Sequence, residues 1–452
     1  MKTTAKKLMG IGIFLFAMLM EGNAQSEKVL QLTLEESLRY AMENNVDAKN
    51  AQLETMIAKA QIVERRSAGL PQVTGSYDVT YNVAIPIVFV PNAGAFQNPN
   101  VDSDVLPLRL GVNYSSALVV QLNQMIFDGS YFVGLKAART FKMLSDFDKE
   151  KSDIDVKETI KKAYFSVLVN EQRSLLIGAN LGRLDTLLKE TQALFEAGFS
   201  EKIDVSRIKV QRNNLKTEMD RVKAARDISI QLLKLQMGLP MEYDIVLSES
   251  LVNLNSPEEI NELFAFQGTR RVEMDQINTS IDLVDLDIKF TTTQYIPNLD
   301  FFGTYQRNGA AQTAGLIYEN DRWVTGAFIG LRMSIPIFDG LLKSSQIQQK
   351  RAQLSQLVNQ KLFLESNIEV EKFQSRTNLE NNLQALKVQQ ENRELALEIF
   401  RMAKIKYDEG VGSNLEVVEA DSALKDAETN YFSALYDALI AKVDLEKSLG
   451  LL

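Results

Sequence analysis

The sequence contains no cysteine and no histidine in its 452 residues. The absence of both residue types excludes a thiolate nucleophile, a Cys/His zinc site, a Ser-His-Asp triad and a structural disulfide. It also removes histidine as a switch that titrates near physiological pH. We expect no catalytic residues, no metal ion and no cofactor.

The chain also lacks an excess of positive charge. Acidic residues outnumber Lys and Arg by 59 to 50, which gives a formal net charge of -9. A general nucleic-acid binder needs a basic face that displaces counterions from phosphates. The charge balance therefore argues against nucleic acid as a partner.

Long apolar runs are absent beyond residue 24. The start of the chain carries lysines and then an apolar stretch at residues 8–20, which is too short to span a bilayer as a helix. Small residues follow up to Ala24, so residues 1–24 are predicted to be a cleaved signal peptide, with a short N-terminal anchor as the alternative. An exported chain without a long apolar helix would cross a membrane as a closed barrel of strands.

The two halves of the chain repeat the same landmarks in the same order. Phe127-Asp128-Gly129 is echoed by Phe338-Asp339-Gly340, and each precedes a long helix-like run. The pattern predicts an internal duplication with a large unit. We expect a first repeat over residues 25–238, an equatorial or linking region over 239–268 and a second repeat over 269–452. The other matched landmarks are Leu70-Pro71 with Ile296-Pro297, residues 195–198 with 407–410, and residues 237–239 with 449–451.

Helical and strand-like stretches alternate within each half. Thr33 and Glu36 have the spacing of a capping box, which predicts a helix from there to about Gly69. The longest helical stretches carry apolar residues at alternating spacings of three and four, as in coiled coils. Further helices are predicted at about 130–196, 201–237, 257–267, 270–294, 341–408 and 414–449, and strands at about 72–83, 108–123, 298–307 and 323–335.

The four strands alternate apolar and polar residues. Each has one apolar face, as transmembrane barrel strands do, whereas a soluble sandwich is the alternative for any single strand. Four strands cannot close a membrane barrel, so several chains must assemble; three copies would give 12 strands, and a dimer is also allowed by this arithmetic. The predicted apolar sets are Val73, Tyr77, Val79, Tyr81 and Val83; Leu108, Leu110, Val112, Tyr114, Leu118 and Val120; Leu299, Phe301 and Tyr305; and Trp323, Ala327, Ile329, Leu331, Met333 and Ile335.

The junctions between strands and helices carry Asp-Gly pairs. Asp128 and Asp339 are predicted to cap the helices that follow, and Gly129 and Gly340 to relax the turns. The links between paired strands, residues 84–107 and 308–322, are predicted to be exposed loops.

The ordered set of motifs resembles the TolC-like outer-membrane efflux family. The resemblance implies a mixed α and β fold: a trimeric 12-stranded transmembrane β-barrel, with four strands per chain, continued by a long α-helical coiled-coil barrel. It implies a homotrimer in outer-membrane lipid of a Gram-negative bacterium, extending into the periplasm. It also implies a passive conduit for efflux or type I secretion, which meets a periplasmic adaptor protein and an inner-membrane pump.

The same resemblance assigns roles at the tips of two helix hairpins. The family's acidic constriction falls on Glu416 and Glu419, and its tip tyrosine and the carboxylate that bonds it fall on Tyr407 and Asp204. Gly412 stands where the family's best-known member has a basic gate residue. The predicted tip turns contain Gly198, Gly410 and Gly412.

Three readings stay open from the sequence. The carboxylates near the tips could equally be a solvated helix surface. A periplasmic coiled-coil adaptor would explain the long helices but not the strands. A cell-wall enzyme with a carboxylate pair has no further catalytic motif to support it. The transported substrate is not indicated by any residue pattern.

Overall fold

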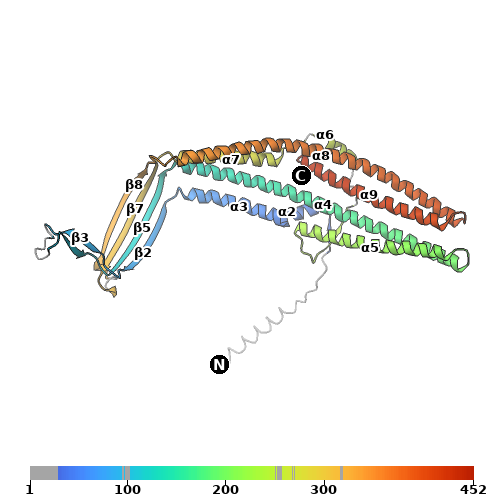
Figure 1. Ribbon diagram of the computed structural model, residues 1–452, viewed down its shortest axis with the longest axis horizontal. Helices are drawn as coiled ribbons and strands as arrows, with labels where there is room; N and C mark the ends of the chain where they lie inside the picture. Colours follow the sequence, from blue (N-terminus) through green and yellow to red (C-terminus); the bar gives the residue numbers. More distant parts are fainter. Residues whose placement is uncertain are drawn as a thin grey trace, which may run out of the picture. The chain divides into compact units, whose positions relative to one another are not determined.

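The computed structural model describes residues 29–93, 96, 102–249, 251, 257–266, 268, 270–315 and 319–452, so the predicted signal peptide lies outside the described residues. The chain is mostly helical with some sheet (Figure 1). It divides into two units built from separate segments of the sequence. Unit 1 takes its described residues from Met1–Gln52, Lys149–Val272 and Glu365–Leu452, and unit 2 from Leu53–Asp148 and Glu273–Leu364.

Apart from the first, the predicted helices form close to their predicted bounds. Four of them are long, and they form two hairpins (Figure 1). The first hairpin joins α4 (Gly129–Glu196) to α5 (Lys202–Met237), and the second joins α8 (Leu342–Asp408) to α9 (Asn414–Ser448). The shorter helices are α2 (Leu34–Asn44), α3 (Val46–Ser67), α6 (Pro257–Ala265), α7 (Val272–Thr293) and the single turn η4 (Asn320–Arg322).

The first predicted helix is interrupted at Asn45. Thr33 and Glu36 form the capping box that the sequence predicts for α2. At Asn45 the side-chain oxygen accepts the backbone N–H groups of Asp47 at 2.7 Å and Ala48 at 3.2 Å. An Asn side chain that bonds the following backbone in this way competes with the helical hydrogen bonds and starts a new helix. The single helix expected up to Gly69 is therefore wrong, and two helices replace it.

The main sheet of unit 2 is antiparallel, with the strand order β2-β5-β7-β8. Cross-strand neighbours share a face, and Val120 of β5 pairs with Gly75 of β2 and Tyr305 of β7. The register thus places on one face all the predicted apolar residues that lie in these strands, which confirms the alternation seen in the sequence. The strands are β2 (Gln72–Tyr81), β5 (Tyr114–Phe127), β7 (Asn298–Ala311) and β8 (Trp323–Ser334).

The start of the second predicted strand is wrong. Residues of β4 (Val105–Arg109) pair with β3 (Ile87–Pro91) in a separate two-stranded sheet, so part of the expected loop 84–107 is a hairpin. Both strands are rich in β-branched and other apolar residues, which favour pairing with each other. Leu108 consequently lies in β4, and Leu110 and Val112 precede β5.

The largest buried cluster of unit 1 surrounds Tyr164 of α4. Its ring is fully buried, and its hydroxyl donates a hydrogen bond to the backbone oxygen of Leu32 at 3.2 Å. Leu32 ends β1 (Val29–Leu32), which pairs in parallel with β6 (Asp244–Leu247). This small sheet and residues from α2, α5 and α9 also contribute to the cluster.

A second buried cluster of unit 1 lies towards the hairpin tips and fixes the helices there. Leu184 of α4, Ile208 of α5 and Val417 of α9 are almost fully buried in it, and Ala403 contributes from α8. Apolar side chains at coiled-coil spacing therefore hold the ends of the two hairpins against each other. Across the described ranges, no helix has both the length and the hydropathy needed to cross a membrane.

Candidate functional site

Both hairpin tips are built by a glycine that follows a long helix. Gly198 has a φ of 79° and Gly410 a φ of 76°, in the left-handed region that glycine adopts without steric cost. The next residue reaches back into the helix: Phe199 N–H bonds the Leu194 oxygen at 2.8 Å, and Val411 N–H bonds the Lys406 oxygen at 3.0 Å. Each glycine therefore forms the turn between the two helices of its hairpin.

Gly412 is required in the second tip for a different reason. A Cβ atom at this position would lie 2.9 Å from the Cβ of Lys406 and 3.0 Å from the backbone of Tyr407. The Gly412 N–H also donates to the Lys406 oxygen at 2.9 Å. The turn therefore has no room for the basic side chain that the resemblance would place at this position.

Asp204 lies in the first turn of α5 and bonds residues of the same hairpin. Its carboxylate accepts the Ser200 hydroxyl at 3.2 Å, the Glu201 N–H at 3.3 Å and the Arg207 guanidinium at 3.2 Å. These bonds close the start of α5 as a reciprocal cap with Glu201. In the described chain the hydrogen bonds of Asp204 thus stay within the first hairpin.

Tyr407 links the second hairpin to α4. Its hydroxyl lies 3.2 Å from the hydroxyl of Thr191, which is fully buried and also accepts the side-chain amide of Asn414 at 3.4 Å. Tyr407 and Asp204 line the same open pocket between the tips, but Tyr407 pairs with Thr191. The Tyr407–Asp204 bond expected from the resemblance stays a prediction.

Glu416 and Glu419 project from the exposed face of α9. Ser413 caps this helix: its hydroxyl accepts the Glu416 N–H at 3.2 Å and lies 3.4 Å from the Glu416 carboxylate. Both glutamates are exposed, whereas Val417 between them is fully buried. Their spacing puts the two carboxylates on one helix face, which is free to line a passage or to meet solvent.

Two other carboxylates of α9, which the sequence analysis did not single out, are buried. Asp421 is 3% exposed and faces Arg183 of α4, and Glu428 is 6% exposed and accepts the side-chain amide of Asn180 at 2.9 Å. Burial raises the pKa of Asp421, and the Arg183 charge opposes that shift. The signal in the sequence is the seven-residue spacing of Asn414, Asp421 and Glu428, which puts polar residues at core positions of a coiled coil.

An ion cluster joins α4 to the end of α9. The Lys447 ammonium lies 2.8 Å from the Asp155 carboxylate and 2.5 Å from the Glu158 carboxylate. Burial alone would raise the pKa of Asp155 and of Glu158. Lys447 bonds both acids, and Lys151 and Lys162 each bond one of them. Together the lysines hold both pKa values below their ordinary range. The cluster is therefore stabilising only while its carboxylates are ionised.

The Asp-Gly turns between strands and helices behave differently from each other. The Asp128 carboxylate accepts the Ser130 N–H at 2.7 Å, and the Asp339 carboxylate accepts the Lys343 N–H at 3.2 Å, so each aspartate bonds the backbone at the start of the helix that follows it. Gly340 has a φ of 65°, in the left-handed region that favours glycine. Gly129 lies outside this region: it is the first residue of α4, and a Cβ there would lie 3.3 Å from the Cβ of Thr293. Close helix packing explains this glycine.

Acidic side chains do not gather into a metal site anywhere in the described ranges: no group of three or more could hold an ion. The site residues described above thus form helix caps, ion pairs and hydrogen bonds between helices.

Sequence comparison relates the chain to known membrane proteins. Residues 269–451 match the family described as "Outer membrane efflux protein". "Outer membrane protein TolC" of Escherichia coli K12 is 20% identical over 455 residues, covering 99% of this chain and 87% of that protein. "Outer membrane efflux protein BepC" of Brucella suis is 20% identical, covering 78% of this chain and 70% of that protein. "Alkaline protease secretion protein AprF" of Pseudomonas aeruginosa is 21% identical, covering 75% and 70%.

Solved structures share the fold. The outer membrane protein VceC of Vibrio cholerae superposes with a TM-score of 0.66 at 13% identity, covering 92% of this chain and 96% of that one. The CmeC outer membrane channel of Campylobacter jejuni superposes with a TM-score of 0.69 at 15% identity, covering 92% and 85%. The fold described above is therefore that of the outer-membrane channels.

Proposed function

We propose that this chain, which is a TolC-like outer-membrane efflux protein, assembles as a homotrimer whose sheets close into one 12-stranded barrel in outer-membrane lipid. The chain is an outer-membrane efflux or secretion channel of a Gram-negative bacterium and a non-enzymatic conduit; the periplasmic adaptor is the less favoured reading. The trimer, the barrel and the partners named below are our proposal.

The observation that carries the proposal is the four-stranded sheet, in which neither outer strand has a second partner among the described strands. β2 and β8 are its outer strands, and one sheet face carries exposed apolar residues such as Val120 and Ile329. Unpaired backbone groups at a sheet edge are costly in lipid, where no water replaces the missing partner. Pairing β2 of one copy with β8 of the next would remove both edges, and three copies give a barrel of ordinary size.

The helices support the same assembly. Leu395, Ile399 and Met402 of α8 have coiled-coil spacing but are 58%, 52% and 50% exposed in the single chain. A second copy would cover this stripe, as knobs of one helix fill holes of another. The near-equal lengths of the matched helices, 68 and 36 residues in α4 and α5 and 67 and 35 in α8 and α9, agree with an internal duplication.

The hairpin tips are the proposed contact with an adaptor protein and an inner-membrane pump. Each tip presents an apolar residue next to its glycine: Phe199 is 83% exposed and Val411 is 80% exposed. In the trimer, Glu416 and Glu419 would converge on one axis near the tips, which would make the narrowest part of the conduit negative. Tyr407, Asp204 and the tip turns would hold that constriction closed.

The test is intermolecular crosslinking at the sheet edges. Because the chain has no cysteine, Ser76→Cys in β2 can be combined with single cysteines along β8. Outer-membrane fractions should then give crosslinked trimers for at least one pair. The matched control is Ser115→Cys in β5, a strand that already has two neighbours, which should give none. A stable monomer in mild detergent, with no crosslink from any β2–β8 pair, would overturn the proposal.

A further inference from the structure

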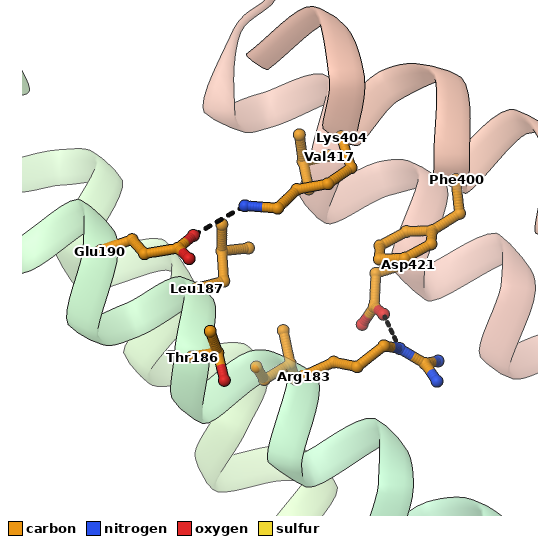
Figure 2. Close-up of a pocket in the computed structure, with 9 residues that line it drawn as sticks. Arg183, Thr186, Leu187, Glu190, Phe400, Lys404, Val417 and Asp421 are labelled. Carbon is orange, nitrogen blue, oxygen red and sulfur yellow. Dashed lines mark hydrogen bonds and ion pairs between the residues drawn. The ribbon is translucent and has the colours of Figure 1, made fainter. Parts of the chain in front are cut away.

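A cavity of about 220 Å³ lies among α4, α8 and α9 in unit 1 (Figure 2). Glu190 lines both this cavity and the open pocket between the tips. Its walls are mostly apolar, and they include side chains that are almost fully buried, such as Leu184 and Val417. The lining residues are Arg183, Leu184, Thr186, Leu187, Glu190, Phe400, Lys404, Val417 and Asp421.

One edge of the cavity holds two polar groups with unused hydrogen-bonding capacity. Asp421 Oδ1 lies 3.7 Å from Arg183 Nε, which is too long for a hydrogen bond. Asp421 Oδ1, Arg183 Nε and Arg183 Nη2 are all buried, and none has a hydrogen-bond partner among the described residues. Figure 2 shows the two side chains pointing toward each other at this edge. Buried polar atoms normally have hydrogen-bond partners, so these atoms indicate a bound small molecule, here called the guest, that supplies them.

The other charges around the cavity are already paired. The Lys404 ammonium bonds the Glu190 carboxylate at 2.7 Å and the Asp408 carboxylate at 2.8 Å. The charged lining residues are two cations, Arg183 and Lys404, and two anions, Glu190 and Asp421. An ionic guest would meet a like charge whichever sign it carried, so a neutral guest fits best.

The aromatic wall is set beside the polar edge. The Arg183 guanidinium carbon lies 5.4 Å from the centre of the Phe400 ring, which holds the guanidinium in place. A guest that reaches Arg183 therefore also contacts Phe400 and the leucines of α4. A small molecule with one polar end and one apolar end matches this surface.

We infer that this cavity is a binding site for a small neutral molecule with an amide-type head. The carbonyl oxygen of the head accepts hydrogen bonds from Arg183 Nε and Nη2, and its N–H donates to Asp421 Oδ1. The apolar end rests against Phe400, Leu187 and Val417. Such a guest touches α4, α8 and α9 together and so ties the two hairpins to each other. The inference concerns the packing of α4, α8 and α9 and does not depend on whether the chain conducts solutes.

Benzamide is the probe, because it carries the amide head on one aromatic ring. Ligand-observed NMR on the purified full-length protein in detergent should show benzamide binding at least about tenfold more tightly than toluene or benzoate, a preference that corresponds to about 1.4 kcal/mol. Toluene lacks the head, and benzoate replaces it with a charge. Equal binding of benzamide and toluene would overturn the assignment of Arg183 and Asp421 to the head group.

Variants locate the site. Thr186 lies exposed at the cavity wall, so Thr186→Trp should block entry without disturbing the core. Asp421→Asn should weaken benzamide binding several-fold, because the acceptor oxygen loses its charge. The matched controls are Thr217→Trp on the exposed face of α5 and Asp426→Asn, whose side chain is 68% exposed on α9. Both controls should bind benzamide as the wild type does.

The outcomes distinguish a cavity that binds a neutral amide from a cavity that holds only water. Loss of binding in Thr186→Trp and Asp421→Asn, with helical content and melting temperature unchanged, supports the site. Absence of benzamide binding to the wild type, or binding that neither variant weakens, would overturn it. Trimer formation and conductance are measured on the same variants, so failure of the conduit would be seen separately.

Discussion

The hydroxyl of Tyr407 on α8 lies 3.2 Å from the hydroxyl of Thr191 on α4, so one hydrogen bond joins the second hairpin to the first near their tips. Thr191 is fully buried and has a further partner in Asn414. This contact, rather than one to Asp204, is the interhairpin bond that Tyr407 makes within the chain. In the proposed conduit, a stronger Tyr407–Thr191 hydrogen bond would favour the closed state of the tips.

Removing this bond should loosen the tip. Tyr407→Phe and Thr191→Val should each destabilise the protein, and a double-mutant cycle should give a coupling free energy of about 0.5–1.5 kcal/mol, as for a buried hydrogen bond. The measurement is urea unfolding in detergent. In planar bilayers, Tyr407→Phe should also raise conductance. Tyr431→Phe, whose ring packs beside Phe432 and Arg393, is the control. Additive effects, with no coupling, would show that the hydroxyl contact contributes nothing.

The paired carboxylates of α9 should set ion selectivity. Glu416→Ala with Glu419→Ala should reduce the preference for cations and weaken block by multivalent cations in planar bilayers, because converging negative charge favours cations. Asp227→Ala, an exposed acid of α5 far along the helix from the tip, is the control and should change neither property. Wild-type selectivity in the double variant would mean that these side chains are a solvated helix face.

The two faces of the sheet should respond differently to charge. Val120→Lys should destabilise the folded protein in lipid by roughly 2–4 kcal/mol if the site lies near the bilayer midplane, and Gln121→Lys should be tolerated. Val79→Lys and Thr80→Lys in β2 form a second pair on the same two faces. Refolding into lipid vesicles, followed by urea titration, measures both pairs. Equal losses within a pair would contradict the predicted facing.

The ion cluster at the end of α9 should make stability fall in acid. The folded-state pKa values of Asp155 and Glu158 are lowered from 3.8 and 4.5. Carboxyls of this kind contribute stability that is fully present above those ordinary values and is lost as pH falls through the folded pKa. The pKa of Lys447 is raised, so its contribution is lost only as pH rises through that folded pKa, above 10.5.

Lys447→Met should reduce the acid-dependent part of the stability, although Lys151 and Lys162 still pair with Asp155 and Glu158. The loss near pH 7 should be at most about 1 kcal/mol, because the side chains are partly solvated. The urea midpoint, compared between pH 3 and pH 7, is the measurement. Lys289→Met, which breaks an exposed pair with Asp285, is the control. A Lys447→Met protein with an unchanged acid dependence would mean that other carboxyls dominate it.

Two turn glycines should differ in their tolerance of alanine. Gly410 has a positive φ but open space around it, so Gly410→Ala should cost about 1–2 kcal/mol of backbone strain. Gly238 also has a positive φ, and a Cβ there would lie 2.4 Å from the Asn44 oxygen, so Gly238→Ala should cost clearly more. Thermal melting compares the two variants. Equal melting temperatures would mean that the backbone near Asn44 shifts freely.

Local signals in the sequence determined much of this protein. The bounds of the long helices, the apolar faces of the strands, the cap at Thr33 and the positive-φ turns at Gly198 and Gly410 were predictable. Each depends on residues a few positions apart, through helical or strand periodicity or through a side chain that bonds the nearby backbone. The same reasoning placed Glu416 and Glu419 on one helix face.

The tertiary structure alone decided which distant segments meet. Pairing of β1 with β6 joins strands of four residues each, too short for a periodic signal. Leu108 alternates as if it belonged to the same strand as β5, but it pairs with β3 as part of β4. The Tyr407–Thr191 bond and the ion pair between the half-buried Arg183 and the buried Asp421 depend on how α4 packs against α8 and α9. Burial and pairing between distant residues are set by packing of whole elements, which local periodicity does not encode.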